Sequence, residues 1–293
     1  MTATVAQQSP AAMSIDVEDW FQVQNLQAGI SRSSWESQES RVERNTDNML
    51  HRLDETKVKA TCFILGWIAN RHPALVKRIA DAGHEIASHG WAHELVYEIG
   101  AERFRTDVRD AKRLLEDLTG MKVNGYRAPN FSICDWALDV LVEEGYTYDS
   151  SSFPVAAHDR YGRLSSARPG EPVYEVRHGL VEVCVSVLPA FTKALPWGGG
   201  GYFRILPYPI FRRGVQSILQ SGKPYVFYIH PWEIDPAQPR VKGIPWSYSF
   251  RHYVNLKACE AKWAQLLRDF RWMRIDQLLK DASIARPTEA NAS

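Results

Sequence analysis

The sequence predicts an α/β fold built on a parallel β-sheet, either open or closed into a barrel. Two observations lead to this prediction. Short apolar runs rich in β-branched and aromatic residues alternate with longer segments of helical periodicity over roughly 250 residues. Polar and ionisable residues stand directly after several of the apolar runs, as they do at the carboxyl-end face of a parallel sheet. The chain shows no internal repeat and no obvious domain linker.

The predicted strands begin with residues 13–18, an apolar run that passes into acidic residues. The polar segment 22–45 follows and is long enough to be a functional loop or a small excursion from the fold. The next strand, 58–65, is rich in β-branched and aromatic residues, which favour extended structure. The full set of predicted strands is 13–18, 58–65, 84–88, 123–127, 146–150, 180–188, 224–230 and 272–275.

Three of the predicted helices carry clear start or periodicity signals. In the segment 101–118 apolar residues recur at helical intervals, and a glycine follows its end. The segment 73–82 opens with Pro73, which suits the first turn of a helix. Asp135 opens the segment 135–144, where its charge interacts favourably with the helix dipole. The full set of predicted helices is 46–56, 73–82, 101–118, 135–144, 206–220, 255–270 and 276–282.

The composition is that of an ordinary globular protein. Hydrophobic residues make up 45% and charged residues 24% of the 293 residues, and the net charge is +1. No long run of Lys and Arg occurs, so we predict neither a nucleic-acid-binding surface nor a polybasic membrane surface. The four cysteines are widely scattered without CxxC spacing, which favours buried free thiols in a reducing compartment over a disulfide framework.

We predict no signal peptide at the N-terminus. Residues 1–12 lack the basic and apolar regions of a signal peptide, and no stretch reaches the length of a transmembrane helix. We therefore predict a cytoplasmic protein with no transmembrane segment. Its N-terminus (1–12) and its tail (284–293) are predicted to be flexible.

Two histidines follow the predicted strand 84–88. His89 and His93 stand four residues apart, and two neutral imidazoles on one short turn suit Zn²⁺ or a similar divalent ion. Such an ion still needs a third protein ligand. Taken alone the pair is weak evidence, because surface histidines occur at this spacing by chance. Other strand ends supply further ligands and catalytic groups.

Ionisable residues follow the first, fourth, fifth and seventh predicted strands as well. Two histidines and a carboxylate can form a catalytic metal site. A second carboxylate can then act as base on a water, an arginine can orient it, and a separate histidine can protonate a leaving group. Each residue taken singly could be a solvated charge, but their coincidence on one face favours a catalytic site. The candidates after the four strands are Asp16, Glu18 and Asp19; Arg127, Pro129 and Asn130; Asp149; and His230 with Trp232.

The glycine-rich run 197–202 is not a phosphate-binding loop, because it lacks the Gly-Lys-Ser/Thr ending and the strand–turn–helix setting. We interpret it as a flexible loop or as a close approach of the backbone to a ligand.

The order of these motifs resembles that of the polysaccharide deacetylases, the NodB-homology domains of carbohydrate esterase family 4. The resemblance covers roughly residues 13–275, most of the chain, and rests on four ordered motifs. Two further segments, Asp-Val-Glu-Asp-Trp-Phe from Asp16 and Gly-Gly-Gly-Tyr-Phe-Arg from Gly199, are similar to the branch found beside exopolysaccharide export and exosortase genes. The four motifs are Asp16-x-Glu18-Asp19, His89-x-x-x-His93, Arg127-x-Pro129 and a late apolar strand that ends in His230.

The resemblance implies a distorted (β/α)₇ barrel, formed by a single deacetylase domain over residues 13–283. It also implies a bound Zn²⁺ or another divalent ion such as Co²⁺. The implied reaction removes N-acetyl groups from amino sugars of a polysaccharide or of its lipid-linked precursor and releases acetate. The implied partners are the N-acetylated oligo- or polysaccharide and a membrane export assembly.

The resemblance also assigns roles to the catalytic candidates. Asp16 matches the base of the family, and Arg127 matches the residue that pairs with this base and orients it. His230 matches the general acid, and Asp149 matches the acidic partner of this histidine. Asn130, whose backbone N–H is the expected oxyanion donor, is assigned with Pro129 and Trp232 to substrate binding.

The metal ligands match less completely. His89 and His93 correspond to the two histidine ligands, but the third ligand is either Glu18 or Asp19. We favour Glu18, because residues 16 and 18 of an extended strand point to the same side. The Ser or Thr that normally follows the first histidine is Gly90 here, so one supporting hydrogen bond is missing or is supplied by another group.

Two other functions stay open. The chain could be a related metal-dependent amidohydrolase that acts on another C–N bond, such as that of a formamido sugar or a ureide. It could also be a non-catalytic, carbohydrate-binding member of an export assembly, which would require the loss of the base or of a metal ligand.

Overall fold

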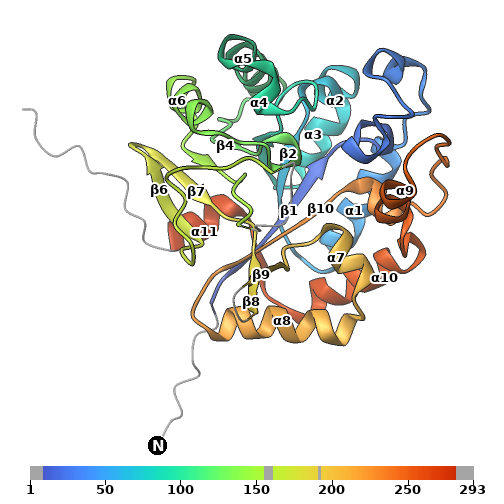
Figure 1. The fold of residues 1–293 in the computed structure, drawn as a ribbon, viewed down its shortest axis with the longest axis vertical. Coiled ribbons are helices and arrows are strands. Elements are labelled where there is room, and N and C mark those ends of the chain that lie inside the picture. Colours follow the sequence, from blue (N-terminus) through green and yellow to red (C-terminus); the bar gives the residue numbers. More distant parts are fainter. Residues whose placement is uncertain (1–8, 155–160, 191–192, 282–293) are drawn as a thin grey trace, which may run out of the picture.

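A curved sheet of nine strands forms the centre of the protein (Figure 1). The computed structural model describes residues 9–154, 161–190 and 193–281. β11 (Trp272–Met273) pairs with the beginning of β1. The other strands follow one another across the sheet in the order β10 (Tyr225–Ile229), β1 (Ala11–Val17), β2 (Thr61–Ile64), β3 (Glu85–Ser88), β4 (Gly125–Tyr126), β5 (Tyr148–Asp149), β7 (Leu180–Val183) and β6 (Val173–Arg177).

Strands β10 to β7 along this path are all parallel, and only β6 at the edge is antiparallel to its neighbour. The segment after β7 approaches β10, where Ser186 N donates to Val226 O (3.3 Å). Tyr228 N also donates to Gly198 O (2.7 Å). The predicted α/β class is confirmed. The parallel strands form a curved half-barrel, in the manner of the distorted (β/α)₇ barrel that the resemblance implies.

Helices cover the outer side of the curved sheet (Figure 1). The inward face of α5 is fully buried, and Gly120 closes the helix in the left-handed conformation, with φ 67°. The helices are α1 (Val42–Glu55), α2 (Gly66–Arg71), α3 (Pro73–Asp81), α4 (Val96–Ile99), α5 (Ala101–Thr119), α6 (Asp135–Glu143), α7 (Gly200–Ile205), α8 (Tyr208–Gln220), α9 (Trp246–Tyr253), α10 (Leu256–Asp269) and α11 (Ile275–Asp281). Short 3₁₀ helices are η1 (Trp20–Gln22), η2 (Gln24–Leu26), η3 (Arg32–Ser37), η4 (Pro129–Phe131) and η5 (Pro231–Ile234).

The polar segment 22–45 is more structured than predicted. It contains η2 and η3, and α1 begins at Val42 rather than at residue 46. The reason is a tertiary contact, because the Asp19 carboxylate accepts hydrogen bonds from the backbone N–H groups of Arg41 (2.8 Å) and Val42 (3.1 Å). The carboxylate of Asp19, which precedes the helix by more than 20 residues, thus takes the place of a local N-cap.

The glycine-rich run is also different from its prediction, because Gly200–Ile205 is the helix α7. Gly199 precedes it with φ 137°, and a Cβ atom on this residue would lie 2.0 Å from Tyr228 O. The close approach is therefore made to strand β10, and glycine is needed for it.

Three further predictions need correction. Strand β1 begins at Ala11, so residues 11 and 12 are buried in the sheet rather than flexible. The predicted strand 180–188 is divided between β7 and β8 (Val187–Ala190), which pairs with β9 (Lys193–Pro196). The sequence did not predict β6, β9, α2, α4 or α9. Residues 1–8 and the tail 284–293 lie outside the described residues.

No helix among the described residues is long and apolar enough to cross a membrane. The four cysteines are free thiols, and three of them are buried, as predicted.

Candidate active site

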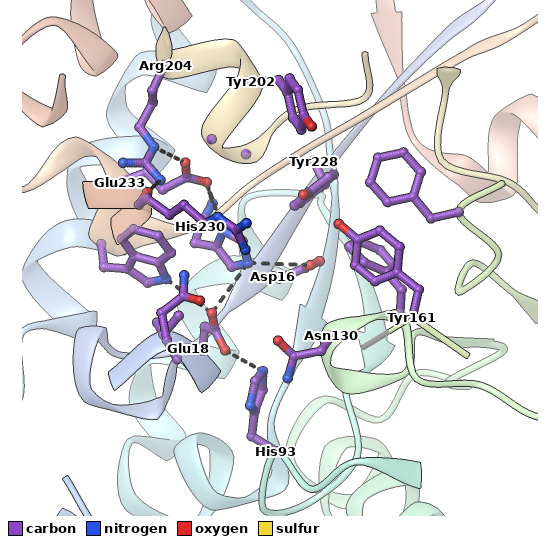
Figure 2. A pocket seen from close by; sticks show the side chains of 18 of the residues that line it. Asp16, Glu18, His93, Asn130, Tyr161, Tyr202, Arg204, Tyr228, His230 and Glu233 are labelled. Atoms are coloured by element: carbon purple, nitrogen blue, oxygen red, sulfur yellow. Dashed lines mark hydrogen bonds and ion pairs between the residues drawn. The ribbon is translucent and has the colours of Figure 1, made fainter. Parts of the chain in front are cut away.

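A pocket of about 370 Å³ opens at the carboxyl ends of the parallel strands (Figure 2). Asp16 and Glu18 enter it from the end of β1, and His89 enters it from the end of β3. His230 follows β10 and faces them. Residues that are more than 200 positions apart in the sequence are therefore brought together, as expected for the ends of neighbouring parallel strands.

Three of these side chains form a cluster suited to a metal ion. One ligand atom from each of Glu18, His89 and His93 lies within 4.8 Å of the other two, and all three residues are buried. His93 Nε2 is 2.8 Å from Glu18 Oε2, and the other ring nitrogen of His93 is buried without a hydrogen-bond partner. His89 Nδ1 is 2.8 Å from the carbonyl oxygen of Arg127, and a proton there leaves Nε2 with a free lone pair. A donor set of two imidazoles and one carboxylate, all buried and close together, fits a divalent ion of the zinc type.

The charge states of two members of this cluster suit ligation. Burial lowers the pKa of His89 to about 4, so its imidazole is neutral at pH 7. Burial alone would raise the pKa of Glu18, but the nearby His93 and His230 outweigh it and hold this pKa well below its ordinary value. A neutral imidazole and an ionised carboxylate are the forms that bind metal.

The turn that carries the two histidines is supported by Asp107 from α5. Its Oδ2 accepts a hydrogen bond from Trp91 N (2.8 Å). A Cβ atom on Gly90 would lie 2.5 Å from the same oxygen, and Gly90 has φ 72°. The glycine that departs from the family pattern therefore makes room for a carboxylate that supports the turn.

Asp19 does not join the cluster. Its carboxylate accepts hydrogen bonds from Trp20 N (2.9 Å) and Ser40 Oγ (2.9 Å), in addition to the two N–H groups at the start of α1. Strand β1 ends at Val17, and the chain then turns, so Glu18 and Asp19 point in different directions. Asp19 is a capping residue, and the structure leaves Glu18 as the carboxylate beside the histidines.

Asp16 is held by a buried arginine. Arg127 Nη1 donates to Asp16 Oδ1 (2.7 Å) and to Ser14 Oγ (2.8 Å). Arg127 Nε and Nη2 donate to the carbonyl oxygen (2.9 Å) and the hydroxyl (2.8 Å) of Ser150. The guanidinium is thus bonded on every side, and Asp16 Oδ2 is left facing His230, 3.8 Å from its Nε2.

His230 lies among three carboxylates (Figure 2). Its Nε2 is 3.3 Å from Glu18 Oε1, and its Nδ1 is 2.8 Å from Glu233 Oε1. Burial lowers the pKa of His230, but Glu18, Glu233 and Asp16 together raise it to about 9. The imidazole is therefore protonated at neutral pH and can donate a proton.

Sequence reasoning assigned no role to Glu233 or Arg204. Glu233 Oε2 accepts a hydrogen bond from Arg204 Nε (2.7 Å), and both side chains are buried. Two signals were available in the sequence. Glu233 stands three residues after His230 at the start of η5, and Arg204 ends the Gly-Gly-Gly-Tyr-Phe-Arg segment.

Asp149 is not the partner of His230, which is a correction to the sequence prediction. It pairs in register with Glu182 on β7, inside the sheet, and Ser151 Oγ donates to its Oδ1 (2.5 Å). Burial raises the pKa of Asp149 to about 6 and that of Glu182 well above its ordinary value. Glu182 Oε1 also accepts from Ser151 N (3.1 Å), so the pair supports the turn beside the arginine-binding Ser150.

The Asp149–Glu182 pair makes stability depend on pH. The folded state holds a proton that the unfolded chain releases above the ordinary Asp and Glu pKa values, so the stabilisation is complete below about pH 4. It is lost as the pH rises through the raised folded-state pKa values. Glu182→Gln should therefore lose less free energy of unfolding between pH 5 and pH 8 than the wild type, as measured by urea denaturation. Glu102→Gln, at an exposed position, serves as control. Equal pH dependences of wild type and Glu182→Gln would contradict the shared proton.

Two of the three predicted substrate-binding residues line the pocket, and the third does not. Asn130 lines the pocket with φ 52°, and its Nδ2 has no hydrogen-bond partner (Figure 2). Trp232 also lines the pocket, donates from Nε1 to Glu18 Oε1 (3.1 Å) and stacks on His230. Pro129 is buried at the start of η4 and does not line the pocket, so its prediction as a substrate contact is wrong.

The chain is similar in sequence to families and proteins of known description. The polysaccharide deacetylase family matches residues 35–148, and a domain of unknown function (DUF3473) matches residues 150–280. A peptidoglycan-N-acetylglucosamine deacetylase from Bacillus cereus is 29% identical over 142 residues, which cover 43% of this chain and 52% of the relative. A peptidoglycan deacetylase from Helicobacter pylori is 33% identical over 92 residues, covering 31% of each chain. The chain thus spans about half of the first relative and less of the second.

Solved structures share the fold. A Mycobacterium smegmatis protein described among the polysaccharide deacetylases superposes with a TM-score of 0.61 at 21% identity, covering 95% of this chain and 92% of that chain. A carbohydrate esterase family 4 pseudoenzyme from Bacillus anthracis superposes with a TM-score of 0.51 at 12% identity, covering 93% and 66%. The match over residues 35–148 and the shared fold agree with the resemblance of the ordered motifs to the polysaccharide deacetylases.

Proposed function

We propose that this protein removes N-acetyl groups from amino sugars of a polysaccharide, as a metal-dependent hydrolase. The observation that carries the proposal is the arrangement in the pocket. The Glu18–His89–His93 cluster lies beside an arginine-bound Asp16 and a glutamate-bound His230. This arrangement offers three candidate metal ligands, a candidate base and a candidate acid, which are the groups that amide hydrolysis requires.

Glu18, His89 and His93 would hold the ion, which we propose to be Zn²⁺ or another divalent ion such as Co²⁺. When bound, such an ion supplies a Lewis acid for the acetamide oxygen and for the attacking water. The donor set of two imidazoles and one carboxylate leaves a position for these oxygens.

The protein side chains move the protons. Asp16 accepts a proton from the water that adds to the acetamide carbon, and Arg127 keeps the carboxylate in place. The backbone N–H of Asn130 is proposed to donate to the oxygen that becomes negatively charged. His230 then donates its proton to the amine nitrogen as the C–N bond breaks, and the products are acetate and a free amino sugar.

Catalysis is favoured over a purely carbohydrate-binding role. The fold alone does not decide this, because a pseudoenzyme from B. anthracis shares it. In the present chain the proposed base and all three proposed ligands lie together in one pocket. Hydrolysis of a different C–N bond, such as that of a formamido sugar or a ureide, uses the same groups and is distinguished by substrate. The lipid-linked precursor, the export assembly and the cytoplasmic location stay predictions.

The test of the proposed function combines metal analysis with acetate release. The purified protein should contain about one divalent ion per chain and should release acetate from an N-acetylhexosamine polymer. Exhaustive chelation should abolish the release, and adding Zn²⁺ or Co²⁺ should restore it. Full activity in protein shown to be free of metal would exclude the proposed mechanism. Release of formate or ammonia, but not acetate, from matched substrates would favour the alternative hydrolase.

The acid role of His230 predicts a dependence on the leaving group. His230→Ala should slow hydrolysis of an N-acetyl substrate by about 10²- to 10⁴-fold. It should slow an acetate ester with a good leaving group far less, because such a group departs without protonation. Glu233→Gln should show the same selectivity with a smaller loss, because Glu233 acts on the proton donor through its contact with His230 Nδ1 (2.8 Å).

Metal content is the control for these two variants, and both should retain the ion. Equal slowing of amide and ester, or loss of the metal from His230→Ala, would show that His230 is not the general acid. That role would then belong to another group on the same face of the barrel.

A further inference from the structure

The active-site pocket extends beyond the catalytic groups onto an exposed apolar surface. Nine large hydrophobic side chains are exposed in the described part of the chain, and four of them line this one pocket. Scattered exposed hydrophobic residues are normal, but a cluster at a pocket marks an interaction site. We call this cluster the aromatic ledge; it consists of Tyr202 and Ile205 from α7 and Trp246 and Phe250 from α9.

Trp246 is the most exposed member of the ledge. Its exposed fraction is 78%, although the indole is the largest apolar side chain available. Its ring stacks on Phe250, with 5.5 Å between ring centroids and 20° between ring planes. One aromatic face is therefore supported from behind by a second ring, and the other is open to solvent.

The ledge is held rigidly against the catalytic groups. Arg204, the last basic residue of α7, donates from Nη2 to Arg251 O (2.8 Å) and from Nη1 to His252 O (2.7 Å) in α9. The same guanidinium donates from Nε to Glu233, which holds His230. One buried arginine thus joins both helices of the ledge to the proposed general acid.

The chemistry of the ledge favours a sugar ring over an acyl chain. Two polar residues of α9, Ser247 and Arg251, line the same pocket as the aromatic rings. A pyranose has apolar C–H faces for an aromatic ring and hydroxyl groups for polar neighbours. An acyl chain has no group that would pair with them. The ledge is also continuous with the pocket in which an acetamido sugar would react.

We propose, on the basis of the deacetylase function proposed above, that the aromatic ledge is a second carbohydrate subsite. It stacks a pyranose ring of the same chain, next to the sugar whose acetamide lies at Asp16 and His230. The enzyme is therefore selective for an oligomer or polymer over a monosaccharide, and Trp246 is the residue that provides most of this selectivity.

Binding and turnover are measured separately. Affinities for N-acetylglucosamine and for its β-1,4-linked tetramer are determined by calorimetry in the metal-loaded Asp16→Asn protein, which should bind substrate without consuming it. The tetramer should bind more tightly than the monosaccharide. Adding Trp246→Ala should weaken tetramer binding by about 3- to 10-fold and monosaccharide binding by less. Trp246→Phe should restore most of the lost affinity.

Ile210→Ala is the matched control, because Ile210 is 49% exposed on α8 and does not line the pocket. It should leave both affinities unchanged. In the active enzyme, Trp246→Ala should lower the ratio of kcat/KM for the tetramer to kcat/KM for the monosaccharide.

Three results would overturn the subsite. They are the absence of tetramer binding, equal loss of both affinities in Trp246→Ala, and Trp246-dependent co-sedimentation with phosphatidylglycerol vesicles while tetramer affinity is unchanged. The last result would identify a lipid surface as the partner. Failure of the deacetylase function is recognised separately, because acetate release would be absent while Trp246-dependent tetramer binding persisted.

Discussion

Glu18→Ala should lose the metal ion and slow amide hydrolysis by about 10³-fold, because the ion supplies several kcal/mol of transition-state stabilisation. The physical reason is the geometry of the cluster, in which Glu18 is the carboxylate beside His89 and His93. Metal content is measured by mass spectrometry after dialysis, and the rate is measured by acetate release. Loss of metal is the decisive measurement, since a merely structural carboxylate would affect the rate without affecting the ion.

Asp19→Ala is the matched control, because it removes the neighbouring carboxylate. Asp19 accepts hydrogen bonds from Trp20 N, Arg41 N and Val42 N, so its loss should lower the free energy of unfolding by about 1–2 kcal/mol. It should leave the metal bound. The assignment of the third ligand would be wrong if Asp19→Ala lost the metal and Glu18→Ala kept it.

Arg127→Met should lower the free energy of unfolding by about 3–5 kcal/mol, because it leaves the carboxylate of Asp16 buried without its partner. Arg127 has no exposed surface, and Asp16 is 2% exposed, so water cannot replace the guanidinium. Urea denaturation measures the loss. Arg127→Lys should recover little of the lost stability. A lysine ammonium lacks the planar set of donors with which the guanidinium reaches Asp16, Ser14 and Ser150 at once.

The double variant Asp16→Asn/Arg127→Met separates the charge from the packing. It should regain part of the lost stability, because no unpaired charge remains. The stability loss of the double variant minus the sum of the two single-variant losses gives the coupling energy of the pair. Asp16→Asn alone should keep the metal and lose about 10²- to 10⁴-fold in rate. Additive stability losses in the cycle, or an active Asp16→Asn protein, would show that the pair is not the oriented base proposed here.

Local patterns predicted the elements that depend on local interactions. The helix α5 was predicted to within one residue of its end, because its buried stripe and its closing glycine are both visible in the sequence. The start of α1 was not predicted correctly, because the helix is capped by the side chain of Asp19, more than 20 residues earlier in the chain. The helix α7 was missed because the glycine run indicates a loop, whereas Gly199 and Gly200 are required for the close contact with Tyr228 of β10.

The sequence by itself determined the parallel α/β class and several of the residues that meet at the strand ends, namely Asp16, Glu18, His89, His93 and His230. Strand order and strand period are sufficient for this, because parallel strands all end at one edge of the sheet. Only the tertiary structure decided which carboxylate faces which partner. The turn after β1 directs Glu18 toward the histidines and Asp19 away, and the two-residue strand β5 leaves Asp149 inside the sheet beside Glu182. Glu233 reaches His230 instead, because η5 turns the chain back at that point. Side-chain direction at a strand end depends on the following turn and on what it packs against, and neither is encoded in the motif itself.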